Sequence, residues 1–299
     1  MSETAHMERE LCSQPDTWRE SVRQAAAGSP LPEAGRRVAV VGCGTSWFMA
    51  QSYAALRERA GLGVTDAFAA SEALLDAGRE YDTVLAITRS GTTTEVLRLL
   101  RAVRGRIPTV TVLGDPDTPA AEVSDRTVAL PFADELSVVQ TRFATAALAL
   151  LRAHLGEDLS AAVSHAEAVL SLPVPQEWVD AEQFTFLGTG WTVGLAHEAA
   201  LKMREASQSW TESYPAMEYR HGPISIAAPN RVTWLFGPSP EGLRQEVTDT
   251  GASFVHHDGR DPLAELVLVQ RVALERARAR GLDPDAPRSL TRSVMLDDS

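Results

Sequence analysis

The sequence predicts an α/β protein with two tandem domains, each a doubly wound, mostly parallel five-stranded sheet flanked by helices. Short apolar runs typical of buried strands alternate with segments of helical spacing over most of the 299 residues. This alternation is typical of a parallel sheet that is covered on both faces. A strand that ends in Gly-x-Gly occurs twice, near residues 41–46 and 187–192. The repetition indicates two copies of one α/β unit.

The first half of the chain contains the first predicted copy. An amphipathic helical region covers residues 1–28, with a break at Pro15. A helical pattern follows most of the expected strands, and the last of these helices is long and covers residues 138–154. The expected strands are residues 37–41, 63–68, 83–87, 109–113 and 127–130. We therefore expect a helical arm (1–30) and a first, phosphate-binding domain (31–155).

The second half repeats the pattern in a shortened form. Residues 156–180 contain a helix and a break at Pro173 and Pro175, and we expect them to connect the domains. A long helix at residues 263–280 precedes an irregular tail. The expected strands of this half are residues 184–187, 231–236 and 252–256. The second domain is therefore expected at residues 181–299.

The composition limits the possible partners. A net charge of −12 argues against binding of nucleic acid, because non-specific binding depends on Lys and Arg that neutralise phosphates. Cys12 and Cys43 are too few for a disulfide framework, and the sequence shows neither a secretory signal nor an apolar run of membrane-spanning length. We expect a cytoplasmic protein that binds neither nucleic acid nor membrane and holds any anionic ligand through amides and hydroxyls.

Hydroxyl-rich turns follow two of the expected strands, at residues 42–46 (GCGTS) and 88–95 (TRSGTTTE). Each leads into a helix, whose free N–H groups and dipole favour an anion. One such turn is explained equally well by helix capping. Two at successive strand ends, where α/β sheets bind ligands, favour a phosphate site. A dinucleotide site is disfavoured because Trp47 stands where the fingerprint needs its third glycine.

Three charged residues form one stripe on the helix expected after residue 190. Glu198, Lys202 and Glu205 lie within roughly 60° of one another at about 100° per residue. The stripe fits an ordinary i,i+4 pair, and it also fits a carboxylate held beside a substrate for proton transfer.

His221 follows in a turn-rich segment. Cys43 fits a small buried residue better than a nucleophile, and His256-His257 lacks partners at metal-ligand spacing, so no metal is expected.

These segments resemble the sugar isomerase (SIS) family, and specifically the isomerase half of glucosamine-6-phosphate synthase (glutamine–fructose-6-phosphate aminotransferase). The similarity extends over nearly the whole chain. In chain order, the matching segments are residues 7–15 (M-x-x-E-x-x-x-Q-P), 43–46 (CGTS), 88–93 (TRSGTT, family S-Q-S-G-E-T), 198–223 (family E-G-A-L-K-L-K-E…E-x-K-H-G-P) and 287–294 (PRSLTRSV, family P-R-N-L-A-K-S-V).

The resemblance implies a role for each candidate residue. Glu205 would move a proton between C1 and C2, with support from Glu198 and Lys202. His221 would open the sugar ring and would reach the site of a second subunit, which implies a homodimer with shared active sites. Gln140 would line the sugar. The residues implied in holding the sugar phosphate are Gly44, Thr45, Ser46, Thr88, Arg89, Ser90 and Thr93.

Three departures from the family pattern bear on the reaction. We expect no glutaminase domain before residue 1, and hence no ammonia made from glutamine. Arg292 stands at the catalytic position where the synthase has an imine-forming lysine, and arginine stays protonated. Thr88 and Arg89 replace Ser and Gln in the phosphate loop, which indicates a tighter clamp or a different substrate position.

The expected function is that of a phosphosugar ketose/aldose isomerase or an aminosugar-phosphate deaminase in amino-sugar metabolism. Its substrate would be a hexose or hexosamine 6-phosphate, and no cofactor is expected. Two alternatives come from other classes. One is a non-catalytic regulatory protein that binds a sugar phosphate, and the other is a nicotinamide-dependent oxidoreductase.

Overall fold

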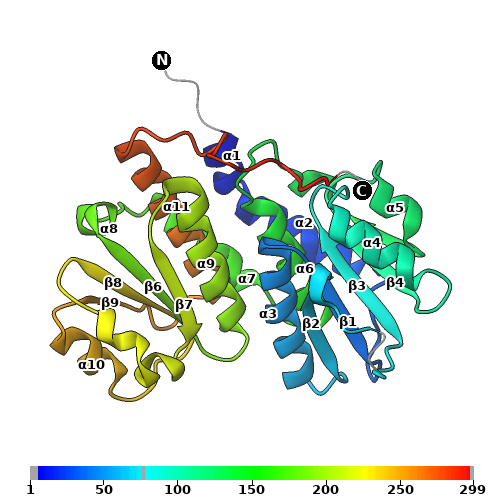
Figure 1. Cartoon of the computed structure of the whole chain (residues 1–299), viewed down its shortest axis with the longest axis horizontal. Helices are drawn as coiled ribbons and strands as arrows, with labels where there is room; N and C mark the ends of the chain where they lie inside the picture. Colours follow the sequence, from blue (N-terminus) through cyan, green and yellow to red (C-terminus); the bar gives the residue numbers. More distant parts are fainter. Residues whose placement is uncertain (1–5, 76–77, 297–299) are drawn as a thin grey trace. The chain divides into compact units, whose positions relative to one another are not determined.

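The computed structural model in Figure 1 describes residues 6–75 and 78–296. The chain forms two compact units, each around one parallel sheet. The five-stranded unit comprises Asp16–Glu135, Arg142–Leu159 and Thr291–Ser299, and the four-stranded unit comprises Met1–Pro15, Leu136–Thr141 and Ser160–Leu290. These units cross the boundaries expected from the sequence, because the N-terminal arm is divided after Pro15 and the tail changes unit after Leu290. The four-part division of the chain stays a prediction.

The sheet of the five-stranded unit has the strand order β2-β1-β3-β4-β5, and every neighbouring pair is parallel. Strand β1, an inner strand of this sheet, is fully buried along its length because its side chains are apolar. The five strands expected in this half are confirmed. They are β1 (Val38–Gly42), β2 (Thr65–Ala69), β3 (Thr83–Thr88), β4 (Thr109–Leu113) and β5 (Arg126–Ala129).

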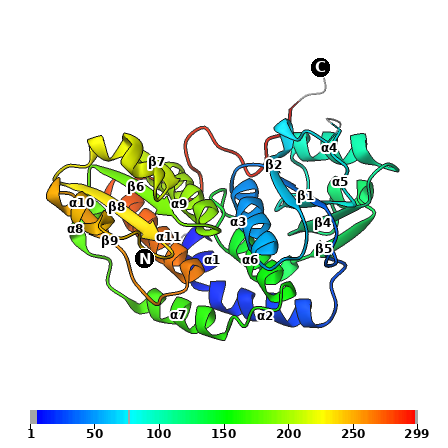
Figure 2. The same ribbon diagram turned by 90° about the horizontal axis from the view of Figure 1, so that it is seen from below.

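Helices cover both faces of this sheet. Figure 2 shows α3 and α6 on one side and α4 and α5 on the other. Alternate residues of β1 and β3, such as Val41 and Val84, form one buried cluster with Val96 and Leu100 of α4. The helical elements of the unit are α2 (Gln14–Ala26), α3 (Thr45–Arg59), α4 (Thr94–Val103), α5 (Pro119–Val123), α6 (Arg142–His154), and the 3-10 turns η1 (Ala70–Glu72) and η2 (Pro131–Ala133).

Helix α6 begins later than the sequence predicted, at Arg142 and not at residue 138. The reason is the carboxylate of Glu135, which accepts hydrogen bonds from the backbone N–H groups of Arg142 (2.9 Å) and Phe143 (3.3 Å). A side-chain acceptor on the first free amides fixes the start of a helix. Residues 138–141, Gln140 among them, are therefore not helical.

The second sheet has four parallel strands in the order β7-β6-β8-β9, so the expectation of five strands is wrong for this unit. After β9 the chain enters the long helix α11, and the described residues beyond α11 form no strand. Strand β7 was missed because its sequence, TESYP, is polar and lies at the sheet edge. The strands are β6 (Gln183–Gly188), β7 (Thr211–Pro215), β8 (Arg231–Phe236) and β9 (Ser253–Val255).

Helices α9 and α11 pack together on one side of this sheet (Figure 1). Trp234 of β8 faces α11, because its indole N–H donates to Glu265 over 2.7 Å, and its ring contacts that of Phe186. Leu187 and Leu235 face the other side and contact Leu243 of α10 in a second cluster. The helical elements are α1 (His6–Cys12), α7 (Ser160–Ser171), α8 (Gln176–Asp180), α9 (Thr192–Ser207), α10 (Leu243–Asp249), α11 (Pro262–Ala279), and the 3-10 turns η3 (Glu218–His221) and η4 (Pro223–Ile226).

The first strand of each sheet ends in a glycine that the next helix requires. A Cβ at Gly42 would lie 2.7 Å from the carbonyl carbon of Ser46, and one at Gly188 would lie 2.4 Å from the carbonyl oxygen of Thr192. A side chain at either position would therefore collide with the first turn of the helix. The same device at both turns agrees with the predicted duplication, which remains a prediction.

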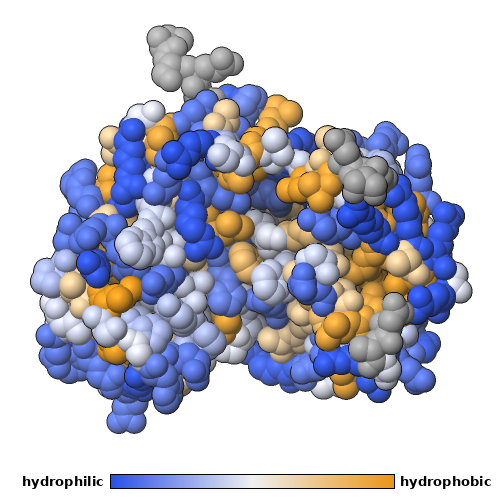
Figure 3. All heavy atoms as spheres, in the orientation of Figure 1, coloured by the Kyte–Doolittle hydropathy of each residue, from blue (hydrophilic) through white to orange (hydrophobic). Residues whose placement is uncertain are grey.

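The face of the molecule in Figure 3 is hydrophilic over most of its area, with hydrophobic side chains in smaller groups. Among the described residues, no helix is both long enough and apolar enough to cross a membrane.

Candidate functional site

The two hydroxyl-rich turns lie at the carboxyl ends of β1 and β3, which are neighbours at the centre of the five-stranded sheet. The strand order reverses between these two strands, and open α/β sheets bind ligands at such a switch point. Gly44, Thr45 and Ser46 start α3, with Thr45 and Ser46 buried. The structure thus places both predicted turns at one edge of one sheet.

The loop after β3 (residues 88–94, the phosphate loop) brings several donors together. Thr88, Arg89 and Ser90 are all buried, at 3%, 2% and 8% exposure. The hydroxyls of Ser90 and Thr93 lie 3.5 Å apart. Thr93 is the residue that precedes α4, so the loop ends at a helix N-terminus. A guanidinium, clustered hydroxyls and free helix amides are the groups that bind a phosphate.

The chain's tail segment (residues 291–296) contacts this loop within the five-stranded unit, and Figures 1 and 2 show the red C-terminal segment ending beside α4. Arg292 donates to both carboxylate oxygens of Asp134, at 2.7 and 2.9 Å, and to the backbone oxygen of Glu135. The hydroxyl of Ser293 lies 2.9 Å from that of Thr92 and 3.1 Å from that of Ser90. Our sequence reasoning missed Ser293 and Asp134, although Ser293 belongs to the matching PRSLTRSV segment.

The charged stripe is formed as predicted on α9 in the four-stranded unit. Lys202 is the only lysine in the sequence. Its Nζ lies 3.5 Å from Oε1 of Glu198 and also donates to Oε2 of Glu205. The side chains of Glu198 and Lys202 are fully buried, whereas that of Glu205 is 19% exposed. The far side of α9 is buried too, as expected for its alanines. Of the three stripe residues, Glu205 is the one that solvent reaches.

A cavity of about 400 Å³ lies beside Glu205. Two guanidinium groups, from Arg204 and Arg288, line it together with the carboxylate. Burial lowers the pKa of Arg204, which also donates to the hydroxyl and the backbone oxygen of Thr211 at 3.1 and 3.3 Å. Arg288 belongs to the matching tail segment but was not among the residues predicted from the sequence.

The other two sugar-contact candidates lie in the four-stranded unit. His221 is exposed at the end of η3. Gln140 lies in the segment Leu136–Thr141, and its side-chain oxygen is buried without a hydrogen-bond partner among the described residues. Both roles stay predictions.

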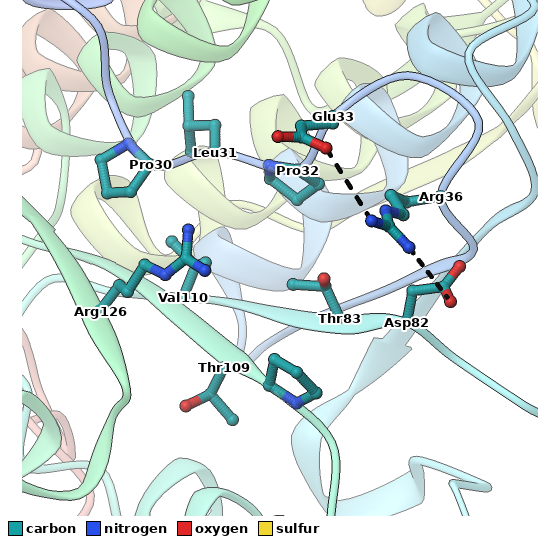
Figure 4. Close-up of a pocket in the computed structure, with 11 residues that line it drawn as sticks. Pro30, Leu31, Pro32, Glu33, Arg36, Asp82, Thr83, Thr109, Val110 and Arg126 are labelled. Carbon is teal, nitrogen blue, oxygen red and sulfur yellow. Dashed lines mark ion pairs between the residues drawn. The ribbon is translucent and has the colours of Figure 1, made fainter.

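A second cavity, of about 260 Å³, is shown in Figure 4 and lies at the opposite edge of the five-stranded sheet. Its walls include Thr83, Thr109 and Arg126, which are the first residues of β3, β4 and β5. Ligands of open α/β sheets bind at the carboxyl ends of the strands and not at this amino edge. We therefore do not assign the function to this cavity.

Cys43 has the properties of a structural thiol. Burial, followed by the charge of Glu95, raises the pKa of its thiol to about 11. At pH 8 this leaves roughly one thiolate in a thousand, against about a quarter for an ordinary cysteine. The structure thus supports the interpretation of Cys43 as a packed residue.

Burial, followed by the charge of Glu8, also raises the pKa of the Cys12 thiol, but Cys12 is exposed, so we expect iodoacetamide at pH 8 to alkylate Cys43 severalfold more slowly than Cys12. Peptide mass spectrometry of the native protein over time measures both rates, and the denatured protein is the control in which they converge. Faster labelling of Cys43 would contradict this assignment.

Within residues 6–75 and 78–296, no group of three or more His, Cys, Asp or Glu side chains is arranged to hold a metal ion.

Comparison with known proteins shows what the chain is similar to. Residues 32–155 match the model of the SIS domain. The isomerizing glutamine–fructose-6-phosphate aminotransferase of Methanothermobacter thermautotrophicus is 30% identical over 311 aligned positions, which cover 87% of this chain and 52% of that protein. This chain spans about half the length of the curated relatives it matches.

Solved structures show the same fold. Glucosamine-6-phosphate deaminase of Thermotoga maritima superimposes with a TM-score of 0.80 at 23% identity, over 97% of this chain and 100% of that one. Tagatose-6-phosphate ketose/aldose isomerase of Escherichia coli superimposes with a TM-score of 0.80 at 18% identity, over 99% of this chain and 98% of that one.

Proposed function

We propose that this chain, which contains a SIS domain and is homologous to the glutamine–fructose-6-phosphate aminotransferases over about half their length, is a phosphosugar isomerase or deaminase. Its substrate would be a hexose or hexosamine 6-phosphate. Its structural neighbours include a glucosamine-6-phosphate deaminase and a tagatose-6-phosphate ketose/aldose isomerase. Both reactions move a proton between C1 and C2 of the open-chain sugar.

The observation that carries the proposal is the environment of Glu205. Its carboxylate is held by Lys202, which is itself fixed by buried Glu198, and it faces a cavity that a sugar-sized molecule fits. A positioned carboxylate can remove a proton from one carbon and return it to the next through an enediol or enamine. With a 2-amino sugar, water then replaces the imine nitrogen and ammonia leaves.

The remaining residues take supporting roles in this proposal. Ser46, Thr88, Ser90 and Thr93 bind the phosphate together with Arg89. Gln140 lines the sugar. His221 assists ring opening from the second subunit of a homodimer.

Arg292 does not form an imine in this proposal. Its guanidinium stays protonated and is bound by Asp134. The chemistry therefore depends on Glu205 and needs no covalent link to the protein.

The test is an activity assay on the purified chain. Glucosamine 6-phosphate should yield fructose 6-phosphate and ammonia, or a ketose 6-phosphate should interconvert with its aldose, and ¹H NMR in D₂O should show exchange at C1 or C2. Binding of a hexose 6-phosphate without turnover or exchange would favour the alternative, a regulatory SIS protein. Neither binding nor turnover over a panel of hexose and hexosamine 6-phosphates would contradict both.

A further inference from the structure

The tail segment uses the donors of the phosphate loop. The hydroxyls of Ser90 and Thr92 donate to the Ser293 hydroxyl oxygen over 3.1 and 2.9 Å, and the Thr93 hydroxyl lies 3.4 Å from the same atom. Three loop hydroxyls thus converge on one oxygen of the tail. An oxygen of a bound phosphate would be held by the same kind of arrangement.

The guanidinium and backbone N–H donors of the loop also form hydrogen bonds to the tail segment. Arg89 donates to the backbone oxygen of Arg292 over 2.6 Å. The backbone N–H of Thr94, the first residue of α4, donates to the backbone oxygen of Val294 over 3.1 Å. The hydroxyl of Thr94 accepts from the N–H of Leu296 over 2.9 Å. Hydroxyl, guanidinium and helix-terminal N–H groups therefore all bind tail oxygens.

An ion pair between the tail segment and the residue after η2 adds to these contacts. The guanidinium of Arg292 binds both oxygens of Asp134, and the two side chains are 36% and 30% exposed. Asp134 follows η2 and belongs to the same unit as the phosphate loop. Nη2 of Arg292 contacts both oxygens of Asp134 while Nη1 donates to the backbone oxygen of Glu135, and together these bonds hold the arginine next to Ser293.

We propose that residues 292–294 are an internal competitor of the phosphate group at this loop, and that the Arg292–Asp134 pair sets the strength of the competition. The tail offers one neutral hydroxyl and two carbonyl oxygens to donors that bind a phosphate dianion more strongly through charge-assisted hydrogen bonds. A phosphate ester therefore displaces the tail reversibly. The inference rests on the proposed function in one respect, the assignment of residues 88–94 as the phosphate site.

Weakening the ion pair should therefore strengthen phosphate binding. When a competing segment occupies a site, the apparent affinity equals the intrinsic affinity multiplied by the fraction of molecules whose site is free. Loss of one partly exposed ion pair changes that fraction by a factor of roughly two to five. We expect Asp134→Asn to lower the Kd for inorganic phosphate by this factor at constant ionic strength, measured on the full chain by calorimetry or by NMR titration.

The matched control is Glu246→Gln. Glu246 also pairs through both carboxylate oxygens with an arginine, Arg220, at 2.7 and 2.8 Å, but in the four-stranded unit. Its Kd for phosphate should equal that of the wild type. Arg292→Lys keeps the charge but cannot place one nitrogen on Asp134 and another on the backbone oxygen of Glu135, so it should act in the same direction as Asp134→Asn. Thermal melting confirms that each variant is folded.

Hydrogen exchange of the tail amides gives a second readout. Phosphate should accelerate the exchange of residues 293–296 over the same concentration range in which it binds. Increased protection, or an unchanged or raised Kd in Asp134→Asn, would overturn the proposal and make Ser293 a phosphate ligand or a bystander. No phosphate binding by the wild type or either tail variant would overturn it as well, together with the phosphate site.

Failure of the proposed reaction is distinguishable from failure of this inference. Phosphate that binds and releases the tail in a chain that turns over no sugar phosphate would contradict the isomerase or deaminase and leave the competition intact. If the chain turned over a sugar phosphate while Asp134→Asn left the Kd for phosphate unchanged, the competition would be contradicted and the isomerase or deaminase would stand.

Discussion

Replacing Glu205 by glutamine is expected to lower kcat for the phosphosugar reaction by about 10²–10⁴-fold, the usual contribution of a positioned acid–base group. The amide keeps the size of the side chain and can still accept a hydrogen bond from Lys202, but it cannot take the proton. KM should change little because the phosphate donors are untouched. The measurement is steady-state kinetics together with solvent deuterium exchange into the product.

Glu275→Gln is the matched control for this substitution. Glu275 is a helical glutamate that pairs with a basic residue, Arg278, at 2.8 Å, but it lies on α11 and is 40% exposed. Its variant should retain wild-type kcat. A Glu205→Gln protein with the turnover and proton exchange of the wild type would refute the role of Glu205 as the base.

Replacing Lys202 by methionine is expected to reduce the free energy of unfolding by about 3–5 kcal/mol, because it leaves the carboxylate of Glu198 buried without its cation. Glu198 and Lys202 are at most 1% exposed, and the two charges are 3.5 Å apart. Methionine fills nearly the same volume, so the loss would not come from a cavity. Urea unfolding followed by circular dichroism measures the change.

The double variant Glu198→Gln/Lys202→Met tests the cause. Since it removes both buried charges, it should be more stable than Lys202→Met alone. If Lys202→Met cost less than about 1 kcal/mol, the pair would have the weight of an ordinary surface salt bridge. The charged stripe would then contribute little to the stability of the fold.

Local sequence patterns were sufficient for most of the fold. The run of residues 38–41 is apolar throughout, and a buried strand in an α/β sheet needs nothing else to be recognised. The polar edge strand β7 lacks that signal, so it was missed. The start of α6 was misplaced because the acceptor that fixes it belongs to Glu135, seven residues before Arg142. Helical periodicity carries no information about such a contact.

The candidate site likewise contains residues whose proximity the sequence predicts and residues whose contact only the structure shows. Glu198, Lys202 and Glu205 are neighbours on one helix, so their spacing alone brought them together. Ser293 and the phosphate loop are separated by about two hundred residues. Neither segment contains a pattern that predicts the contact, and only the folded chain shows that the tail oxygens take the loop's donors.

The position of Lys202 has a practical consequence for labelling the protein. Apart from histidine, every basic side chain is an arginine except Lys202. Its amine is buried and paired with two carboxylates of its own helix, α9. Amine-directed reagents therefore find no lysine on the surface of the native chain. Modification at Lys202 would report the opening of its surroundings, so the chain carries its own probe of motion around the proposed base.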